Sequence, residues 1–162
     1  MDRIGKQTKA TRRAVVTGAG AALLGAAAPT VVVGPARATP EEMQATINKL
    51  VGDAKLKAGK ITIDIPPLVE NGNTVPCTVT VDSPMTEQNY CKAIHVLNER
   101  NPQPNVISVY LNPRSGRAAF STRIRLSDTQ NVTVVAELSN GSFWSASVNV
   151  VVTIGACLED VI

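Results

Sequence analysis

The sequence predicts an all-β protein, an immunoglobulin-like antiparallel β-sandwich of about seven strands preceded by a short N-terminal helix. Three observations support this fold class. β-Branched residues, mainly Val and Thr, dominate the second half of the 162-residue chain. From Lys60 onward, apolar and polar residues alternate with a period of two, as they do in half-buried strands. Turn residues separate these alternating segments at intervals that are typical of a small sandwich domain.

Residues 1–38 are predicted to form a cleavable signal peptide of the twin-arginine type. Arg12 and Arg13 precede an apolar stretch over residues 14–33, and Ala36-Arg37-Ala38 supplies a small-residue cleavage site. A membrane anchor is the alternative, but the stretch is rich in Gly, Pro and Thr and is only weakly apolar. We therefore expect export to the periplasm by the twin-arginine route, with no membrane attachment after cleavage.

The leader also holds much of the positive charge of the chain. It contains six of the 16 basic side chains and one of the 13 acidic side chains. The remaining residues are therefore slightly acidic, with no basic patch to neutralise phosphates. This excludes nucleic acid as an expected partner.

A segment of helix and linker is expected over residues 39–59, with the helix itself over about 40–57. Thr39 can cap the helix, Pro40 suits the first helical position, and two acidic residues fill the first turn. Apolar residues recur at roughly helical spacing as far as Leu56, and Gly59 ends the segment.

The sandwich domain is predicted over residues 60–154. Its seven expected strands cover residues 61–65, 75–81, 90–98, 106–112, 118–126, 132–138 and 144–154. Asn140-Gly141 predicts a tight hairpin between the last two strands. The final strand has the longest alternation, with an inward row that is expected to comprise Trp144, Ala146, Val148, Val150, Val152 and Ile154.

The sequence lacks the familiar catalytic constellations. It has no CxxC pair, no phosphate-binding glycine loop and no carboxylate pair at a spacing that suits acid–base catalysis. The one histidine, His95, is expected to be structural or solvent-facing, and a single histidine is too few for the iron site of a superoxide-reductase-like enzyme. We expect a protein that is not an enzyme and that needs no metal or cofactor.

Three cysteines in an exported chain leave at least one thiol without an intramolecular partner. Cys77 and Cys91 belong to successive strands, and they either form a disulfide or are buried as small hydrophobic residues. Cys157 follows the last strand, in a C-terminal tail predicted over residues 155–162 with Gly155 and Ala156 as its hinge. A thiol in that position can enter the active site of a partner enzyme.

Several motifs together resemble the SoxY family, the sulfur-carrier subunit of the bacterial thiosulfate-oxidising (Sox) system. The matching stretches cover residues 65–76, 101–104, 114–117, 122–126, 142–144 and 152–157. The resemblance implies that Cys157 bears sulfur covalently and that the chain forms a heterodimer with a SoxZ-like small β-sandwich subunit. It also implies that a c-type cytochrome complex loads Cys157 and that hydrolase and dehydrogenase components then act on the bound group.

The tail departs from the family pattern. SoxY proteins usually end in Gly-Gly-Cys-Gly-Gly, whereas here Ala156 replaces the second glycine and Leu158-Glu159-Asp160-Val161-Ile162 replaces the final pair. The acidic side chains after Cys157 raise the expected pKa of its thiol, so a partner has to supply the activation. The alternative function is a periplasmic binding or assembly module in which Cys157 only forms an intermolecular disulfide.

Overall fold

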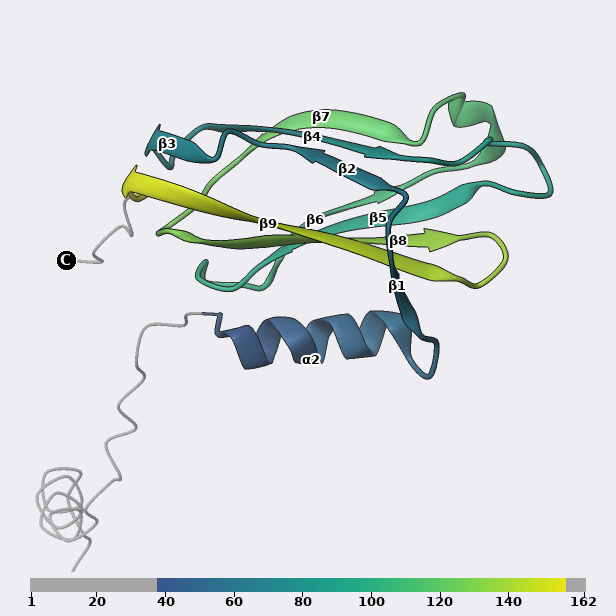
Figure 1. Ribbon diagram of the computed structural model, residues 1–162, viewed down its shortest axis with the longest axis horizontal. Helices are drawn as coiled ribbons and strands as arrows, with labels where there is room; N and C mark the ends of the chain where they lie inside the picture. Colours follow the sequence, from purple (N-terminus) through teal and green to yellow (C-terminus); the bar gives the residue numbers. More distant parts are fainter. Residues whose placement is uncertain (1–37, 157–162) are drawn as a thin grey trace, which may run out of the picture. The chain divides into compact units, whose positions relative to one another are not determined.

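Two β-sheets pack face to face in the computed structural model, which describes residues 38–156 (Figure 1). The larger sheet has the strand order β1 (Leu56–Ala58), β9 (Phe143–Ile154), β8 (Gln130–Leu138), β5 (Cys91–Asn98) and β6 (Asn105–Tyr110), and β3 (Leu68–Asn71) also pairs with β9. The smaller sheet has the order β2 (Ile61–Asp64), β4 (Val75–Val81) and β7 (Ala119–Ile124). This arrangement confirms the predicted all-β sandwich.

The alternation of apolar residues builds the core between the two sheets. In β4, Val75, Cys77, Val79 and Val81 are buried and the residues between them are exposed or half-buried. They meet buried side chains of the larger sheet, such as Ile94 and Val134, in one apolar cluster. Burial of these side chains stabilises the sandwich, by about 1.5–3 kcal/mol for each Val, Leu or Ile.

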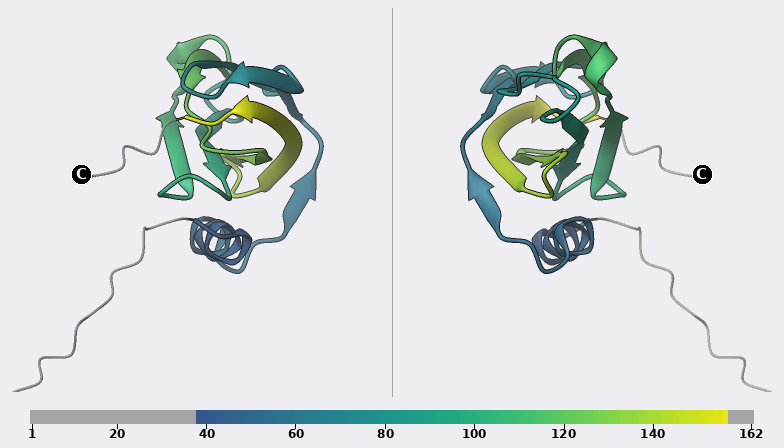
Figure 2. Two further views of the ribbon diagram at one scale, coloured as in Figure 1. Left: turned by 90° about the vertical axis from the view of Figure 1, so that its left-hand side faces the viewer. Right: turned by 90° about the vertical axis from the view of Figure 1, so that its right-hand side faces the viewer.

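Helix α2 (Pro40–Val51) covers the outer face of the six-stranded sheet, as the end views in Figure 2 show. Met43, Ile47 and Val51 lie one helical turn apart and pack against Leu97 of β5 and Val135 of β8. The helix begins where the sequence predicts: the side chain of Thr39 accepts a hydrogen bond from the backbone N–H of Glu42, and the side chain of Glu42 accepts one from the N–H of Thr39.

The predicted end of the helix was wrong. The helix stops at Val51, and Gly52 follows it with a positive φ of 60°. Leu56–Ala58 then forms β1, which runs parallel to the start of β9. Pairing of this segment with a strand almost 90 positions further along the chain overrides its moderate helical spacing, because propensity is weaker than tertiary pairing.

Strands β1 and β3 were not predicted from the sequence. Both are short, and both pair in parallel with the same edge of β9, β1 near its start and β3 near its end. The remaining sheet pairings among the described strands are antiparallel, as predicted. Ile154, which was expected to face inward, has 64% of its surface exposed because it lies at the end of β9, beyond the core.

Candidate functional site

The end of β9 is tied to two loops that lie far from it in sequence. The backbone N–H of Gly72, in the loop after β3, donates to the carbonyl of Ile154 at 2.8 Å. The N–H of Leu126 donates to the carbonyl of Gly72 at 2.8 Å, and the N–H of Ala156 donates to the carbonyl of Leu126 at 2.9 Å. We call the five residues Gly72, Leu126, Ser127, Gly155 and Ala156 the tail clasp.

Both glycines of the tail clasp are closely surrounded by backbone. A Cβ atom on Gly72 would lie 2.1 Å from the carbonyl oxygen of Leu126 and 2.9 Å from the nitrogen of Ala156. A Cβ atom on Gly155 would lie 2.1 Å from the carbonyl oxygen of Ser127. Glycine is therefore required at both positions to let three backbone segments approach one another.

A polar network links the tail clasp to the loop between β5 and β6. The side-chain oxygen of Asn101 accepts hydrogen bonds from the N–H of Ser127 and from the side-chain amide of Gln130, each at 3.1 Å. The side-chain nitrogen of Asn101 donates to the carbonyl of Arg125 at 2.8 Å. Asn101 thus holds the segment that carries Leu126 and Ser127 against the larger sheet.

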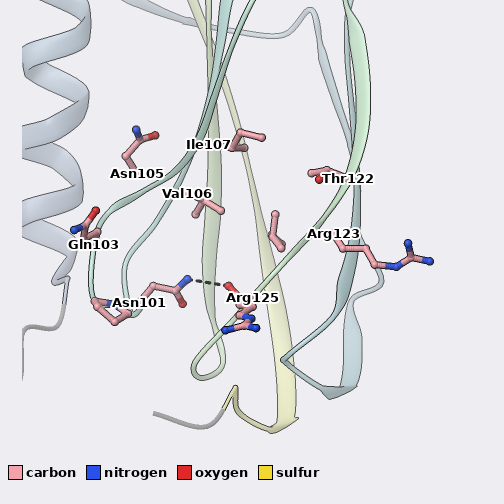
Figure 3. A pocket seen from close by; sticks show the side chains of 10 residues that line it. Asn101, Gln103, Asn105, Val106, Ile107, Thr122, Arg123 and Arg125 are labelled. Atoms are coloured by element: carbon pink, nitrogen blue, oxygen red, sulfur yellow. Dashed lines mark hydrogen bonds between the residues drawn. The ribbon is translucent and has the colours of Figure 1, made fainter. Parts of the chain in front are cut away.

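A groove of about 440 Å³ lies beside this network, between the edge strands β6 and β7 of the two sheets. Figure 3 shows Arg125 next to Asn101 at one end of the groove, whereas the guanidinium of Arg123 turns away from it. Val106 and Ile107 of β6 give the groove an apolar wall. The groove is thus an open, mixed polar and apolar surface, and its lining residue Arg125 directly precedes Leu126 of the clasp.

Exposed apolar side chains flank the other side of the clasp. Leu68 of β3 pairs with Val151 of β9, and their exposed fractions are 61% and 44%. Together with Ile154, they expose apolar surface along the edge that leads to the tail.

Most of the motifs that resemble the SoxY family meet at this end of the sandwich. Four of the six motifs contribute residues to the clasp, the network or the groove, namely Gly72, residues 101–103, residues 122–126, and Gly155 with Ala156. Residues 114–117 and 142–144 lie elsewhere: Arg114 and Ser115 belong to the 3₁₀ turn η1 (Pro113–Ser115), and Trp144 packs near Lys57 and Lys60, whose ammonium groups lie 5.6 and 5.4 Å from its ring centroid.

Sequence reasoning missed Gly72 and Leu126 as residues of this site. Both stood inside the matching motifs, but they bear no chemically reactive group, and their role depends on backbone contacts. Gly155 and Ala156 lie within the described residues and belong to the clasp, whereas Cys157 lies outside the described residues. The prediction that Cys157 bears sulfur stays a prediction.

The structure describes Cys77 and Cys91 as free, buried cysteines, so of the two alternatives it shows buried thiols and no disulfide. Their strands belong to different sheets: β4 pairs with β2 and β7, and β5 pairs with β6 and β8. Burial raises the pKa of each thiol to about 11, helped by the negative charge of Asp64 near Cys77 and of Glu137 near Cys91.

His95 is a buried residue of β5 rather than a solvent-facing one. Its Nδ1 lies 2.8 Å from the hydroxyl of Ser108 on the neighbouring strand β6, and its ring meets that of Tyr110 edge-on at 6.1 Å. Burial lowers the pKa of His95, against the opposing effect of the Glu137 carboxylate. These contacts agree with the structural role that was predicted.

The described part of the chain contains no cluster of three or more His, Cys, Asp or Glu side chains that is close enough to hold a metal ion. Within residues 38–156, no helix combines the length and the apolar character that spanning a membrane requires.

Comparison with known proteins gives both a family and a fold. A family model described as "Sulfur oxidation protein SoxY" matches residues 47–157. The solved structure of the sulfur carrier protein SoxY from Chlorobium limicola f thiosulfatophilum is 29% identical, with a TM-score of 0.60 over 70% of this chain and 98% of that chain. A search of curated protein sequences finds no match.

More distant structures share the fold alone. The superoxide reductase (neelaredoxin) from Ignicoccus hospitalis is 13% identical, with a TM-score of 0.53 over 71% of this chain and 94% of that chain. The superoxide reductase from Nanoarchaeum equitans is 9% identical, with a TM-score of 0.50 over 59% of this chain and 100% of that chain.

Proposed function

The chain belongs to the SoxY family, and from this premise we propose that it carries sulfur intermediates of thiosulfate oxidation covalently on Cys157. The observation that carries the proposal is the family match, whose last residue is Cys157. The likeness to a solved sulfur carrier over 98% of that carrier's length supports it. The described geometry is compatible with a carrier: the chain is anchored as far as Ala156, the residue directly before the thiol.

Loading of Cys157 is an oxidation. The Cys157 thiol loses its proton, and its sulfur forms an S–S bond with the outer sulfur of thiosulfate. Two electrons leave in this step, and a c-type cytochrome complex accepts them. The chain itself supplies the nucleophile, while hydrolase and dehydrogenase components act on the bound group. In this scheme the protein is a non-catalytic subunit.

The proposal includes a location and a partner. Export by the twin-arginine route, with cleavage after Ala38, would deliver the folded carrier to the periplasm. There it would form a heterodimer with a SoxZ-like small β-sandwich subunit. Thr39 would then be the first residue of the mature chain, directly before α2, and the intact mass of the exported protein reports this cleavage.

Mass spectrometry of the tail peptide tests the proposal. Trypsin places Cys157 in a different peptide from the other two cysteines. The sequence after Arg125 contains no Lys or Arg, so residues 126–162 form one tryptic peptide, and its single cysteine is Cys157. Cys77 and Cys91 fall together in the peptide from Ile61 to Lys92. Protein from thiosulfate-grown cells is expected to carry added sulfur on the first peptide and none on the second.

Replacement of the thiol completes the test. Cys157→Ser should abolish thiosulfate oxidation in a reconstituted system and leave the fold intact, as measured by circular dichroism. An unmodified Cys157 in cells with a complete, active system would contradict the carrier proposal. Full activity of Cys157→Ser, together with a dimer that reductant dissociates in the parent protein, would favour the assembly module instead.

A further inference from the structure

The geometry points to Gly72 as a positioning residue that fixes the base of the C-terminal tail. The tail clasp holds Gly155 and Ala156 in place, so that the backbone is anchored as far as the residue directly before Cys157. The inference rests on the proposed function for its meaning, since it concerns how the carrier thiol is presented. It assigns a role to Gly72, a residue with no reactive group.

Gly72 shares its backbone groups between two partners. Its N–H donates to the carbonyl of Ile154, and its carbonyl accepts from the N–H of Leu126. Leu126 in turn accepts from Ala156 through its own carbonyl. Gly72 therefore links the end of β9 to the loop that anchors Ala156.

The surroundings of Gly72 leave no space for a side chain. A Cβ atom there would meet only backbone atoms at less than 3.0 Å, the carbonyl of Leu126 and the nitrogen of Ala156. Backbone cannot rotate away as a side chain can, so any larger residue has to separate Leu126 from Ala156. Those two atoms form the hydrogen bond that closes the clasp.

Gly155, which was predicted as a hinge, is held in place as well. Because Gly155 has no side chain, its backbone can lie close to Ser127. A Cβ atom on Gly155 would be only 2.1 Å from the carbonyl oxygen of Ser127. Ile154 on one side of Gly155 and Ala156 on the other both have hydrogen-bonded backbone groups. Rotation at Gly155 would break at least one of these hydrogen bonds, so its flexibility is not available while the clasp is closed.

The consequence is a short tether, by which we mean the chain between the last anchored residue and Cys157. Successive Cα atoms lie about 3.8 Å apart, so a closed clasp keeps Cys157 within one residue of the sandwich. Opening the clasp would lengthen the tether by two residues, or about 7 Å. A partner enzyme that takes the thiol from the closed state has to contact this end of the sandwich, where the groove beside Asn101 and Arg125 lies.

Amide exchange tests the clasp directly. In the parent protein, the N–H of Ala156 should exchange with solvent at least tenfold more slowly than expected for an unstructured chain, as measured by nuclear magnetic resonance. Gly72→Ala should remove this protection while amides in the middle of β5 and β8 keep theirs. An Ala156 amide that exchanges at the unstructured rate in the parent protein would overturn the inference.

Thiol accessibility supplies a readout that loss of stability alone would not change. The measured quantity is the maleimide ratio, which is the rate at which a bulky polymer-linked maleimide modifies Cys157 divided by the rate for a small maleimide. We expect this ratio to be several-fold lower in the parent protein than in Gly72→Ala. Gly141→Ala is the matched control: Gly141 has a positive φ of 76° and open space around it, so the change strains the backbone without touching the clasp. An equal ratio in all three proteins would contradict the positioning role.

Two further measurements separate a loss of the clasp from a loss of the fold. The buried thiols of Cys77 and Cys91 should stay unmodified in each variant, which shows that the domain remains folded. If Gly72→Ala does not fold, Ala156→Pro is the second variant. It removes the N–H that donates to the carbonyl of Leu126, so it should raise the maleimide ratio in the same way.

The clasp and the carrier function can fail independently of each other. If the Ala156 amide is protected but Cys157 never carries sulfur, the carrier proposal fails and the clasp stands. Sulfur on Cys157 together with an unprotected Ala156 amide would support the carrier proposal and overturn the clasp.

Discussion

At the scale of single residues, identical side chains have different chemistry because their surroundings differ. Cys77 and Cys91 have almost no exposed surface, at 1% and 0%. Burial penalises the thiolate, so the pKa of each rises to about 11. These two thiols are therefore poor nucleophiles at neutral pH, which leaves Cys157 as the cysteine for the proposed chemistry.

The raised thiol pKa values predict a loss of stability in alkali. Above pH 9, the thiols ionise in the unfolded chain but stay protonated in the folded one until about pH 11. The stabilisation is thus complete below pH 9 and falls as the pH rises through this window, by on the order of 2 kcal/mol per thiol. Urea unfolding at pH 8, 9, 10 and 11 measures the free energy of unfolding across this window.

The double variant Cys77→Ala/Cys91→Ala is the control for this prediction. Other groups that ionise in alkali are the same in both proteins, so they cancel in the comparison. The free energy of unfolding should fall less steeply with pH in the variant than in the parent, although it starts lower because of the cavities. Parallel profiles would show that the two thiols do not contribute.

At the scale of elements, local capping residues determine where α2 begins, and tertiary contacts determine where it packs on the sheet. Thr39, Pro40 and Glu42 define the start of the helix by capping, which acts within one turn. The position of the helix on the sheet depends instead on Ile47 and its neighbours, which meet Leu97 and Val135. Most helical stability in a folded protein comes from such packing.

Removal of the cap should destabilise the protein modestly. Thr39→Ala deletes the acceptor for the Glu42 N–H and is expected to cost about 1 kcal/mol. Thr46→Ala is the matched control in the same helix, because the half-buried Thr46 loses only an exposed hydrogen bond from its hydroxyl to the carbonyl of Glu42. Chemical denaturation of the mature protein should separate the two variants, and equal stabilities would argue against the capping box.

At the scale of the whole domain, side chains pack against both faces of the six-stranded sheet. One face meets the three-stranded sheet in the main core, and the other meets α2 in a smaller cluster. Leu126, which is fully buried, joins this core to the tail clasp: its side chain belongs to the main cluster, and its backbone bonds Gly72 and Ala156. Leu126 therefore contributes to stability through its side chain and to anchoring of the tail through its backbone.

Truncation of that side chain should separate the two roles. Leu126→Ala is expected to lower the free energy of unfolding by about 2–5 kcal/mol through loss of apolar contacts and a residual cavity. The backbone carbonyl remains, so the size dependence of Cys157 modification should match that of the parent protein. Ile154→Ala, at an exposed position, should change stability by less than about 0.5 kcal/mol. Thermal unfolding and the maleimide ratio measure the two effects.

The sequence by itself determined the fold class, the start of α2 and seven strands, because alternation and capping are local patterns that one segment carries alone. It also identified the motifs around Gly72, Asn101 and Leu126 that now prove to meet. The end of α2, the strands β1 and β3 and the separation of Cys77 from Cys91 were decided by the tertiary structure. Each depends on contact between segments far apart in the chain, which no periodicity within one segment records.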